Sequence, residues 1–199
     1  GMISKGETVS LKVNVAARKD IEKNHSATHL LQKALKEVLG SHVEQKGSLV
    51  TADRLRFDFA HFTAMTAEEI GKVEKIVNEQ IQANNKVVTD IMSLDEAKHS
   101  GAIALFDEKY EDNVRVVSVG EFSTELCGGT HVSNSSDIGM FKILSESGIA
   151  SGVRRIEAIT GSNVYQYLLE KEAVLDEIKS LVKSNEDNLV IKLSQTIED

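Results

Sequence analysis

Two short motifs, each with a pair of possible metal ligands four residues apart, constrain how this chain can fold. The segment NHSATH holds His25 and His29, and ELCGGTH holds His131 and Cys127, the only cysteine of the chain. On a helix, a spacing of four puts both side chains on one face, with Cβ atoms about 5–6 Å apart. In the second motif, two glycines permit a tight turn that can aim both side chains at one spot. Three imidazoles and one thiolate form a ligand set that favours zinc.

Each motif alone has a simpler explanation. His25 and His29 alone would more often be partly buried rings bonded to backbone, and a lone cysteine is usually a small apolar core residue. Ser26 stands where zinc metalloproteases carry a glutamate as general base, so that class is excluded. Histidine-rich sets are more typical of catalytic than of structural zinc. Taken together, the motifs predict a hydrolytic or substrate-binding zinc site.

The apolar periodicity predicts an α+β fold, in which an antiparallel sheet packs with helices. Alternating apolar residues predict a first strand over 9–15, and a helical stripe follows from about 17 to 39. Capping boxes at Thr66 and Ser93 predict two more helices, the first ending near Asn84. Short connections favour antiparallel pairing of the remaining strand-like segments, which are 48–51, 55–60, 86–92, 114–119, 121–126, 139–145 and 153–159.

The pattern of the chain changes after Gly161. Apolar residues recur there at helical spacing among many Lys and Glu, and a second short helix is expected after Asn185. We therefore expect one domain over 1–160 and a helical extension over 161–199, which begins a linker to a further C-terminal domain. The Gly1–Met2 start is typical of a tag-removal scar, which predicts that the chain is a piece of a larger protein.

Composition places the chain among ordinary globular proteins and limits the kinds of partner to be expected. No apolar run approaches the roughly 20 residues needed to span a bilayer, so no membrane partner is expected. A single cysteine cannot form an internal disulfide, which favours a reducing, cytoplasmic location. The formal net charge of −8 argues mildly against a nucleic-acid partner, although a local basic strip on an acidic body is compatible with one.

Longer blocks of sequence resemble one enzyme family. The blocks NHSATHLLQKAL, HVEQKGSLV, RLRFDF, ELCGGTHV and SGVRRIEAITG occur in this order between about Val13 and Gly161. They closely resemble the editing domain of bacterial alanyl-tRNA synthetases. The editing domain of threonyl-tRNA synthetase and stand-alone alanyl-tRNA editing proteins share the HxxxH and CxxxH motifs. The resemblance therefore implies the fold of the threonyl/alanyl-tRNA synthetase second additional domain.

The same resemblance implies an activity, a cofactor and partners. The activity is hydrolysis of the ester in mischarged Ser-tRNA(Ala) and Gly-tRNA(Ala), with zinc as cofactor and the tRNA(Ala) acceptor end as partner. A second, hydrolytic site is needed because the small apolar pocket that selects alanine would reject an amino acid with an added hydroxyl only about a hundredfold. The full-length protein would also join alanine to tRNA(Ala) with ATP, using other domains of the same chain.

The resemblance also assigns roles to single residues. His25, His29, Cys127 and His131 match the family's metal ligands, while Thr28 and Gln45 line its editing pocket and Ser48 lies beside them. The Thr28 hydroxyl could meet the serine hydroxyl of the substrate, or it could bond the carbonyl four residues earlier in its own helix. Gln45 could instead be a solvated loop residue. These seven positions form the expected site.

Basic residues near the blocks are candidates for contact with tRNA phosphate, although each alone is more often a solvated surface charge. Arg154 and Arg155 are neighbours in an expected strand, so at most one of them should face the site. The six candidates are Lys46, Arg54, Arg56, Lys142, Arg154 and Arg155.

The sequence leaves two mechanisms and two other functions open. Zinc could lower the pKa of a bound water towards about 7. Alternatively, zinc could hold the substrate's amino or hydroxyl group while Gln45 or the free ribose hydroxyl orients a separate water. The other functions are a stand-alone trans-editing deacylase, which the helical extension disfavours, and a non-catalytic tRNA-binding module with structural zinc.

Overall fold

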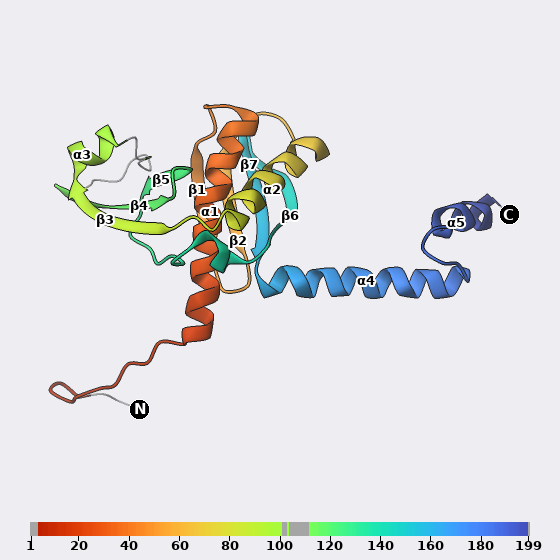
Figure 1. Cartoon of the computed structure of the whole chain (residues 1–199), viewed down its shortest axis with the longest axis horizontal. Helices are drawn as coiled ribbons and strands as arrows, with labels where there is room; N and C mark the ends of the chain where they lie inside the picture. Colours follow the sequence, from red (N-terminus) through yellow and green to blue (C-terminus); the bar gives the residue numbers. More distant parts are fainter. Residues whose placement is uncertain (1–3, 101–102, 104–111, 199) are drawn as a thin grey trace. The chain divides into compact units, whose positions relative to one another are not determined.

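A computed structural model of the chain describes residues 4–100, 103 and 112–198 and divides the chain into two compact units, Gly1–Gly161 and Ser162–Asp199 (Figure 1). The first unit has an α+β fold with antiparallel sheets, which confirms the predicted fold class. The Gly1–Met2 scar that we predicted lies outside the described residues. The editing role of the first unit and the linker role of the second stay predictions.

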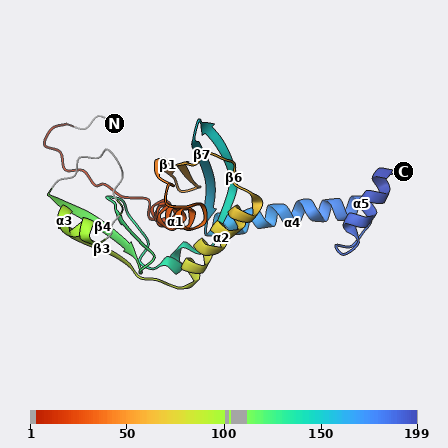
Figure 2. The same ribbon diagram turned by 90° about the horizontal axis from the view of Figure 1, so that it is seen from above.

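The larger sheet carries most of the core. Its strands follow the order β1-β2-β7-β6 with antiparallel neighbours, and two helices cover one face of it (Figure 2). The largest fully buried side chains include Leu30, Leu31, Phe57 and Phe59, which join the helices to this face. The elements are α1 (Val15–Leu39), β1 (Gln45–Val50), β2 (Leu55–Ala60), α2 (Ala67–Gln82), β6 (Phe141–Ala150) and β7 (Val153–Thr160).

A smaller sheet has the order β3-β4-β5, again antiparallel. Its own apolar cluster joins Ala97 of a short helix to Val114, Val116 and Leu126. The elements are β3 (Val87–Ser93), α3 (Leu94–His99), β4 (Asn113–Val119) and β5 (Ser123–Leu126), and a 3-10 turn that we did not predict, η1, spans Ser135–Ile138. Helix α1 contacts β5 of this sheet as well as β1, β2 and β7 of the larger one, so it joins the two sheets.

The second unit contains the two helices that we predicted after Gly161. They are α4 (Ser162–Val182) and α5 (Leu189–Glu198), and residues of the two helices contact each other. No helix among the described residues is long and apolar enough to cross a membrane.

The predicted strand over 9–15 is wrong. Residues 9–14 form neither helix nor strand, Leu11 is 91% exposed, and Val15 already belongs to α1. The Asn14 side chain accepts a hydrogen bond from the Ala17 backbone N–H and so caps the helix at this point. An alternating segment becomes a strand only where another strand pairs with it, and no described strand pairs with 9–15.

The helix ends follow the sequence signals closely. Gly40 ends α1, and both predicted capping boxes are present at Thr66 and Ser93. The strand ends differ more: β1 begins three residues earlier than we predicted, at Gln45, and β6 continues to Ala150. Strand ends depend on the partner strand, which short-range patterns do not identify.

The Thr66 cap should contribute measurably to stability. Thr66 Oγ1 accepts a hydrogen bond from Glu69 N at 3.2 Å, and Glu69 Oε2 accepts one from Thr66 N at 2.8 Å. We expect Thr66→Ala to lower the free energy of unfolding by about 0.5–2 kcal/mol, measured by urea denaturation. Thr63→Ala, in the same loop but outside the cap, serves as control and should cost less than about 0.5 kcal/mol. Equal losses in the two variants would contradict this role of the cap.

Candidate metal centre

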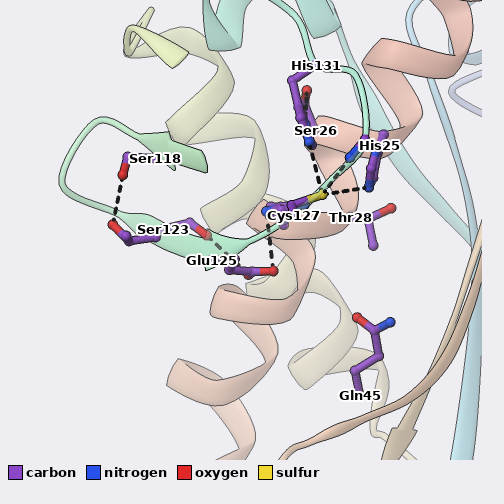
Figure 3. Close-up of polar contacts among 12 residues, drawn as sticks. His25, Ser26, Thr28, Gln45, Ser118, Ser123, Glu125, Cys127 and His131 are labelled. Atoms are coloured by element: carbon purple, nitrogen blue, oxygen red, sulfur yellow. Dashed lines mark hydrogen bonds and ion pairs between the residues drawn. The ribbon is translucent and has the colours of Figure 1, made fainter. Parts of the chain in front are cut away.

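The fold brings the two predicted half-motifs together where α1 meets the loop after β5 (Figure 3). One ligand atom from each of His25, His29, Cys127 and His131 lies within 4.8 Å of the others. The Cys127 Sγ atom is 3.5 Å from His25 Nε2 and 3.3 Å from His131 Nε2. Helix α1 supplies two of the imidazoles, and the turn after β5 supplies the thiol and the third imidazole. The four side chains therefore converge as one cluster, and their role as metal ligands stays a prediction.

Two separations within the cluster match those of a tetrahedral zinc site. With zinc–nitrogen bonds of about 2.0–2.1 Å and zinc–sulfur bonds of about 2.3 Å, neighbouring ligand atoms should lie about 3.3–3.6 Å apart. The two separations measured from Cys127 Sγ, 3.5 and 3.3 Å, fall in this range. His29 is buried, while the other three ligands are half-buried. The residues present thus fit zinc in number and chemistry, and in the two separations measured from Cys127.

Each imidazole has a further protein partner outside the cluster. Ser26 Oγ lies 3.2 Å from His131 Nδ1, and Glu125 Oε2 lies 3.2 Å from His29 Nδ1. The backbone of Thr130 hydrogen-bonds the His25 ring. Second partners of this kind orient metal-binding histidines and fix which ring nitrogen carries the proton. For His131 the arrangement favours Nε2 as the ligand atom, whereas His29 Nδ1 contacts Glu125 without forming a hydrogen bond.

Arg115 braces the turn that carries Cys127. Its Nη1 donates hydrogen bonds to the carbonyl oxygens of Cys127, at 2.7 Å, and of Gly129, at 2.6 Å, and Cys127 N donates to Arg115 O at 3.0 Å. Sequence reasoning missed this residue, because nothing in its neighbourhood distinguishes Arg115 from other arginines in strands. Glu125 was missed too, although it stands only two residues before Cys127 in the sequence.

Burial keeps the imidazoles neutral. It lowers the pKa of His29 to about 3 and that of His131 to about 2, and the neighbouring positive charges, Arg115 among them, add to the effect. Burial also lowers the pKa of His25. Burial raises the pKa of Glu125 to about 8, against a hydrogen bond from Ser123. The contact between His29 and Glu125 has the distance of an ion pair, but both partners are uncharged at neutral pH. Neutral imidazole is the form that binds metal.

Acid should destabilise the zinc-free chain through these histidines. Their pKa is near 6.5 in the unfolded chain but about 3 for His29 and about 2 for His131 when folded. Below about pH 6.5 the unfolded chain therefore binds protons that the folded chain does not, so the free energy of unfolding falls. Glu125 acts in the opposite direction, since its pKa rises from 4.5 to about 8 on folding and its contribution is lost as the pH rises to 8.

Thermal melting of chelator-treated protein between pH 4 and pH 9 measures this balance. Below pH 6.5 three histidines act against one glutamate, so we expect Tm to fall towards acid; above it Glu125 prevails, so Tm should fall towards alkali. The Tm maximum should thus lie near pH 6.5, and replacing His131 by Asn should flatten the acid side. A Tm that rises steadily towards pH 4 would contradict the depressed histidine pKa values.

The three expected pocket residues have polar groups that are engaged within the protein. Thr28 Oγ1 donates a hydrogen bond to Asn24 O at 2.9 Å, which is the bond within its own helix that the sequence left open. Gln45 Nε2 donates to Ser48 Oγ at 3.2 Å. Figure 3 shows Thr28 beside the cluster and Gln45 farther from Cys127. The pocket roles of Thr28, Gln45 and Ser48 stay predictions.

The six candidate phosphate contacts all have acidic neighbours. A phosphate would have to share each of these cations with a carboxylate, which weakens its attraction, so their tRNA role stays a prediction. The pairs are Lys46 with Glu44, Arg54 with Glu157, Arg56 and Arg155 with Asp58, Lys142 with Glu74, and Arg154 with Glu146.

Comparison with known proteins shows which family and which enzymes this chain is similar to. Residues 114–157 match the family described as threonyl and alanyl tRNA synthetase second additional domain. The chain is 58% identical over 199 residues to alanine–tRNA ligase 1 of Lachnoclostridium phytofermentans and 55% identical over 199 residues to alanine–tRNA ligase of Clostridioides difficile. It is 54% identical over 198 residues to the enzyme of Nitrosomonas eutropha. Each match covers 100% of this chain and 23% of the relative, so the chain spans about a quarter of the length of these relatives.

Proposed function

We propose that this chain belongs to the threonyl and alanyl tRNA synthetase second-additional-domain family, in the form found in alanine–tRNA ligases, and that it is a zinc-dependent aminoacyl-tRNA deacylase. Its substrates would be the esters of Ser-tRNA(Ala) and Gly-tRNA(Ala). The observation that carries the proposal is the convergence of three imidazoles and one thiol within 4.8 Å. This donor set suits zinc, and family membership connects it with mischarged tRNA.

His25, His29 and Cys127 are the minimum set that would hold the metal, with His131 as the fourth ligand. When bound, zinc would supply Lewis-acid chemistry to water or to the substrate. Four protein ligands would fill a tetrahedral shell, so a site that accepts an oxygen from water or substrate would need one of the four positions free.

Thr28 could provide the discrimination against serine. Its hydroxyl proton is committed to Asn24 O, so its oxygen remains a hydrogen-bond acceptor. The hydroxyl of a wrongly attached serine could donate to this oxygen, whereas the methyl group of alanine could not. A site that hydrogen-bonds a substrate hydroxyl rejects the analogue that lacks it far better than an apolar pocket rejects an added hydroxyl. Gln45, held by Ser48, has a carboxamide oxygen that could orient water or ribose.

The wider role of the protein is part of the same proposal. The relatives that share this region are alanine–tRNA ligases, which points to a whole protein that attaches alanine to tRNA(Ala) with ATP. Its other domains would then supply most of the tRNA affinity, which is compatible with the net charge of −8 here. A cytoplasmic location belongs to this proposal.

Deacylation of defined tRNAs tests the activity. We expect the chain to bind one zinc per molecule, to hydrolyse Ser-tRNA(Ala) and Gly-tRNA(Ala), and to spare Ala-tRNA(Ala). Cys127→Ala should lose zinc and activity together. If this variant lost zinc yet still hydrolysed Ser-tRNA(Ala) normally, the proposed role of the metal would be wrong.

A non-catalytic tRNA-binding module with structural zinc is the second candidate. The observation that favours it is the complete set of four protein ligands, which is typical of structural sites. A structural metal would unfold the first unit when removed, whereas a catalytic metal would leave a folded, inactive protein. Melting curves with and without chelator distinguish the two functions.

A further inference from the structure

We propose that Ser26 is a positioning residue for the metal centre, which holds His131 in the orientation that metal binding requires. The inference rests on the proposed zinc site. Ser26 is the residue whose identity excluded a metalloprotease, and it stands on α1 between the ligands His25 and His29. Its side chain is fully buried, so its hydroxyl must find partners within the protein.

Two groups from the other half of the site meet this hydroxyl. Val132 N donates a hydrogen bond to Ser26 Oγ at 3.1 Å, and His131 Nδ1 lies 3.2 Å from the same oxygen. Ser26 therefore contacts the side chain of one ligand and the backbone that directly follows it. The partners of the other two rings, Glu125 and the Thr130 backbone, come from β5 and its loop. Of the three rings, His131 alone has a side chain of α1 as its partner outside the cluster.

The direction of these bonds follows from the ligand atom. His131 Nε2 faces Cys127 Sγ at 3.3 Å, so Nε2 is the atom that would bind the metal. Nε2 must then carry a lone pair, which places the ring proton on Nδ1. Ser26 Oγ has two lone pairs; it accepts from Val132 N and, in the metal-bound form, would also accept from His131 Nδ1. Without this oxygen, the metal-bound form would bury an N–H group that has lost its acceptor.

Zinc titration of matched serine variants tests the inference. Ser135 is also fully buried, and its Oγ accepts a hydrogen bond from Asn85 N at 2.8 Å and donates one to Gln80 O at 2.7 Å. Ser26→Ala and Ser135→Ala thus each remove a buried hydroxyl that accepts a backbone N–H, and both should lower the Tm of the zinc-free chain. Only Ser26→Ala should weaken zinc binding, by about 10–100-fold, measured by competition with a chromophoric chelator.

A cobalt spectrum supplies a second readout that a general loss of stability does not change. The visible absorption of Co²⁺ bound to the chain reports the geometry of the ligands, and we expect it to shift in Ser26→Ala but not in Ser135→Ala. If the unaltered chain bound no zinc, the proposed metal site itself would be wrong. If the unaltered chain and Ser26→Ala bound zinc equally tightly, with one cobalt spectrum, the role of Ser26 would be wrong while the site stands. Equal weakening in both variants would also overturn it.

Discussion

His29→Ala is expected to abolish stoichiometric zinc binding and to lower kcat/KM for Ser-tRNA(Ala) by about a thousandfold or more. His29 is the buried member of the cluster and carries the Glu125 contact at 3.2 Å, so no solvent-exposed group can replace it. Loss of the metal removes several kcal/mol of transition-state stabilisation, and each 1.36 kcal/mol corresponds to a factor of ten. Metal content by mass spectrometry and deacylation of radiolabelled Ser-tRNA(Ala) measure the two effects.

His42→Ala is the matched control for this prediction. His42 is exposed and pairs with His61, its Nε2 lying 2.9 Å from His61 Nδ1, and neither ring belongs to the four-residue cluster. It should retain zinc and activity, since it removes an imidazole without touching the cluster. Retained hydrolysis in metal-free His29→Ala would show that the ester is cleaved without zinc. If both variants lost zinc and activity equally, the loss would reflect general damage to the fold.

Gly129→Ala is also expected to disrupt the centre, although it changes no ligand. A Cβ atom on Gly129 would overlap the His25 ring and lie 2.5 Å from its Nδ1, closer than real Cβ contacts allow. Either the ring or the turn must then move, and a ligand displaced by about 1 Å costs on the order of a hundredfold in activity. Arg115 resists movement of the turn because it holds the carbonyls of Cys127 and Gly129. We therefore expect His25 to be displaced and zinc affinity to fall.

The preceding glycine provides the control. A Cβ atom on Gly128 meets nothing within 4 Å, so Gly128→Ala adds the same methyl group to open space. This variant should bind zinc and hydrolyse Ser-tRNA(Ala) at close to the unaltered rates. Zinc affinity and deacylation that were the same in both alanine variants would contradict the close packing of Gly129 against His25.

Local signals in the sequence were sufficient for the helices and for the composition of the cluster. Thr66 and Ser93 cap helices through bonds that span three residues, which a linear pattern contains in full. The pairs His25–His29 and Cys127–His131 are likewise local. Chemistry alone then indicated that two local pairs of metal ligands belong together, and the fold brings them within 4.8 Å.

The features that the sequence did not predict depend on contacts between segments that are distant in the sequence. The pattern over 9–15 contains everything a strand needs except a partner, and the described part of the chain provides none. The closely spaced strands were expected in one sheet, but they separate into two because β7 pairs with β2 and β6, whereas β4 pairs with β3 and β5. Ser26, Arg115 and Glu125 act through single long-range contacts, for which no spacing rule exists. Residues of this kind can be identified only from the three-dimensional structure.

The separation of His25 and Cys127 by 102 residues has a consequence for how the site is assembled during synthesis. A ribosome releases the helix with its two imidazoles long before the thiol exists, so a metal ion met early finds at most half of its ligands. Closing a loop of this length costs chain entropy that only the packed sheets can offset. The metal would therefore bind late, to a domain that is already almost folded. It would then hinder the separation of two segments that lie far apart in the sequence.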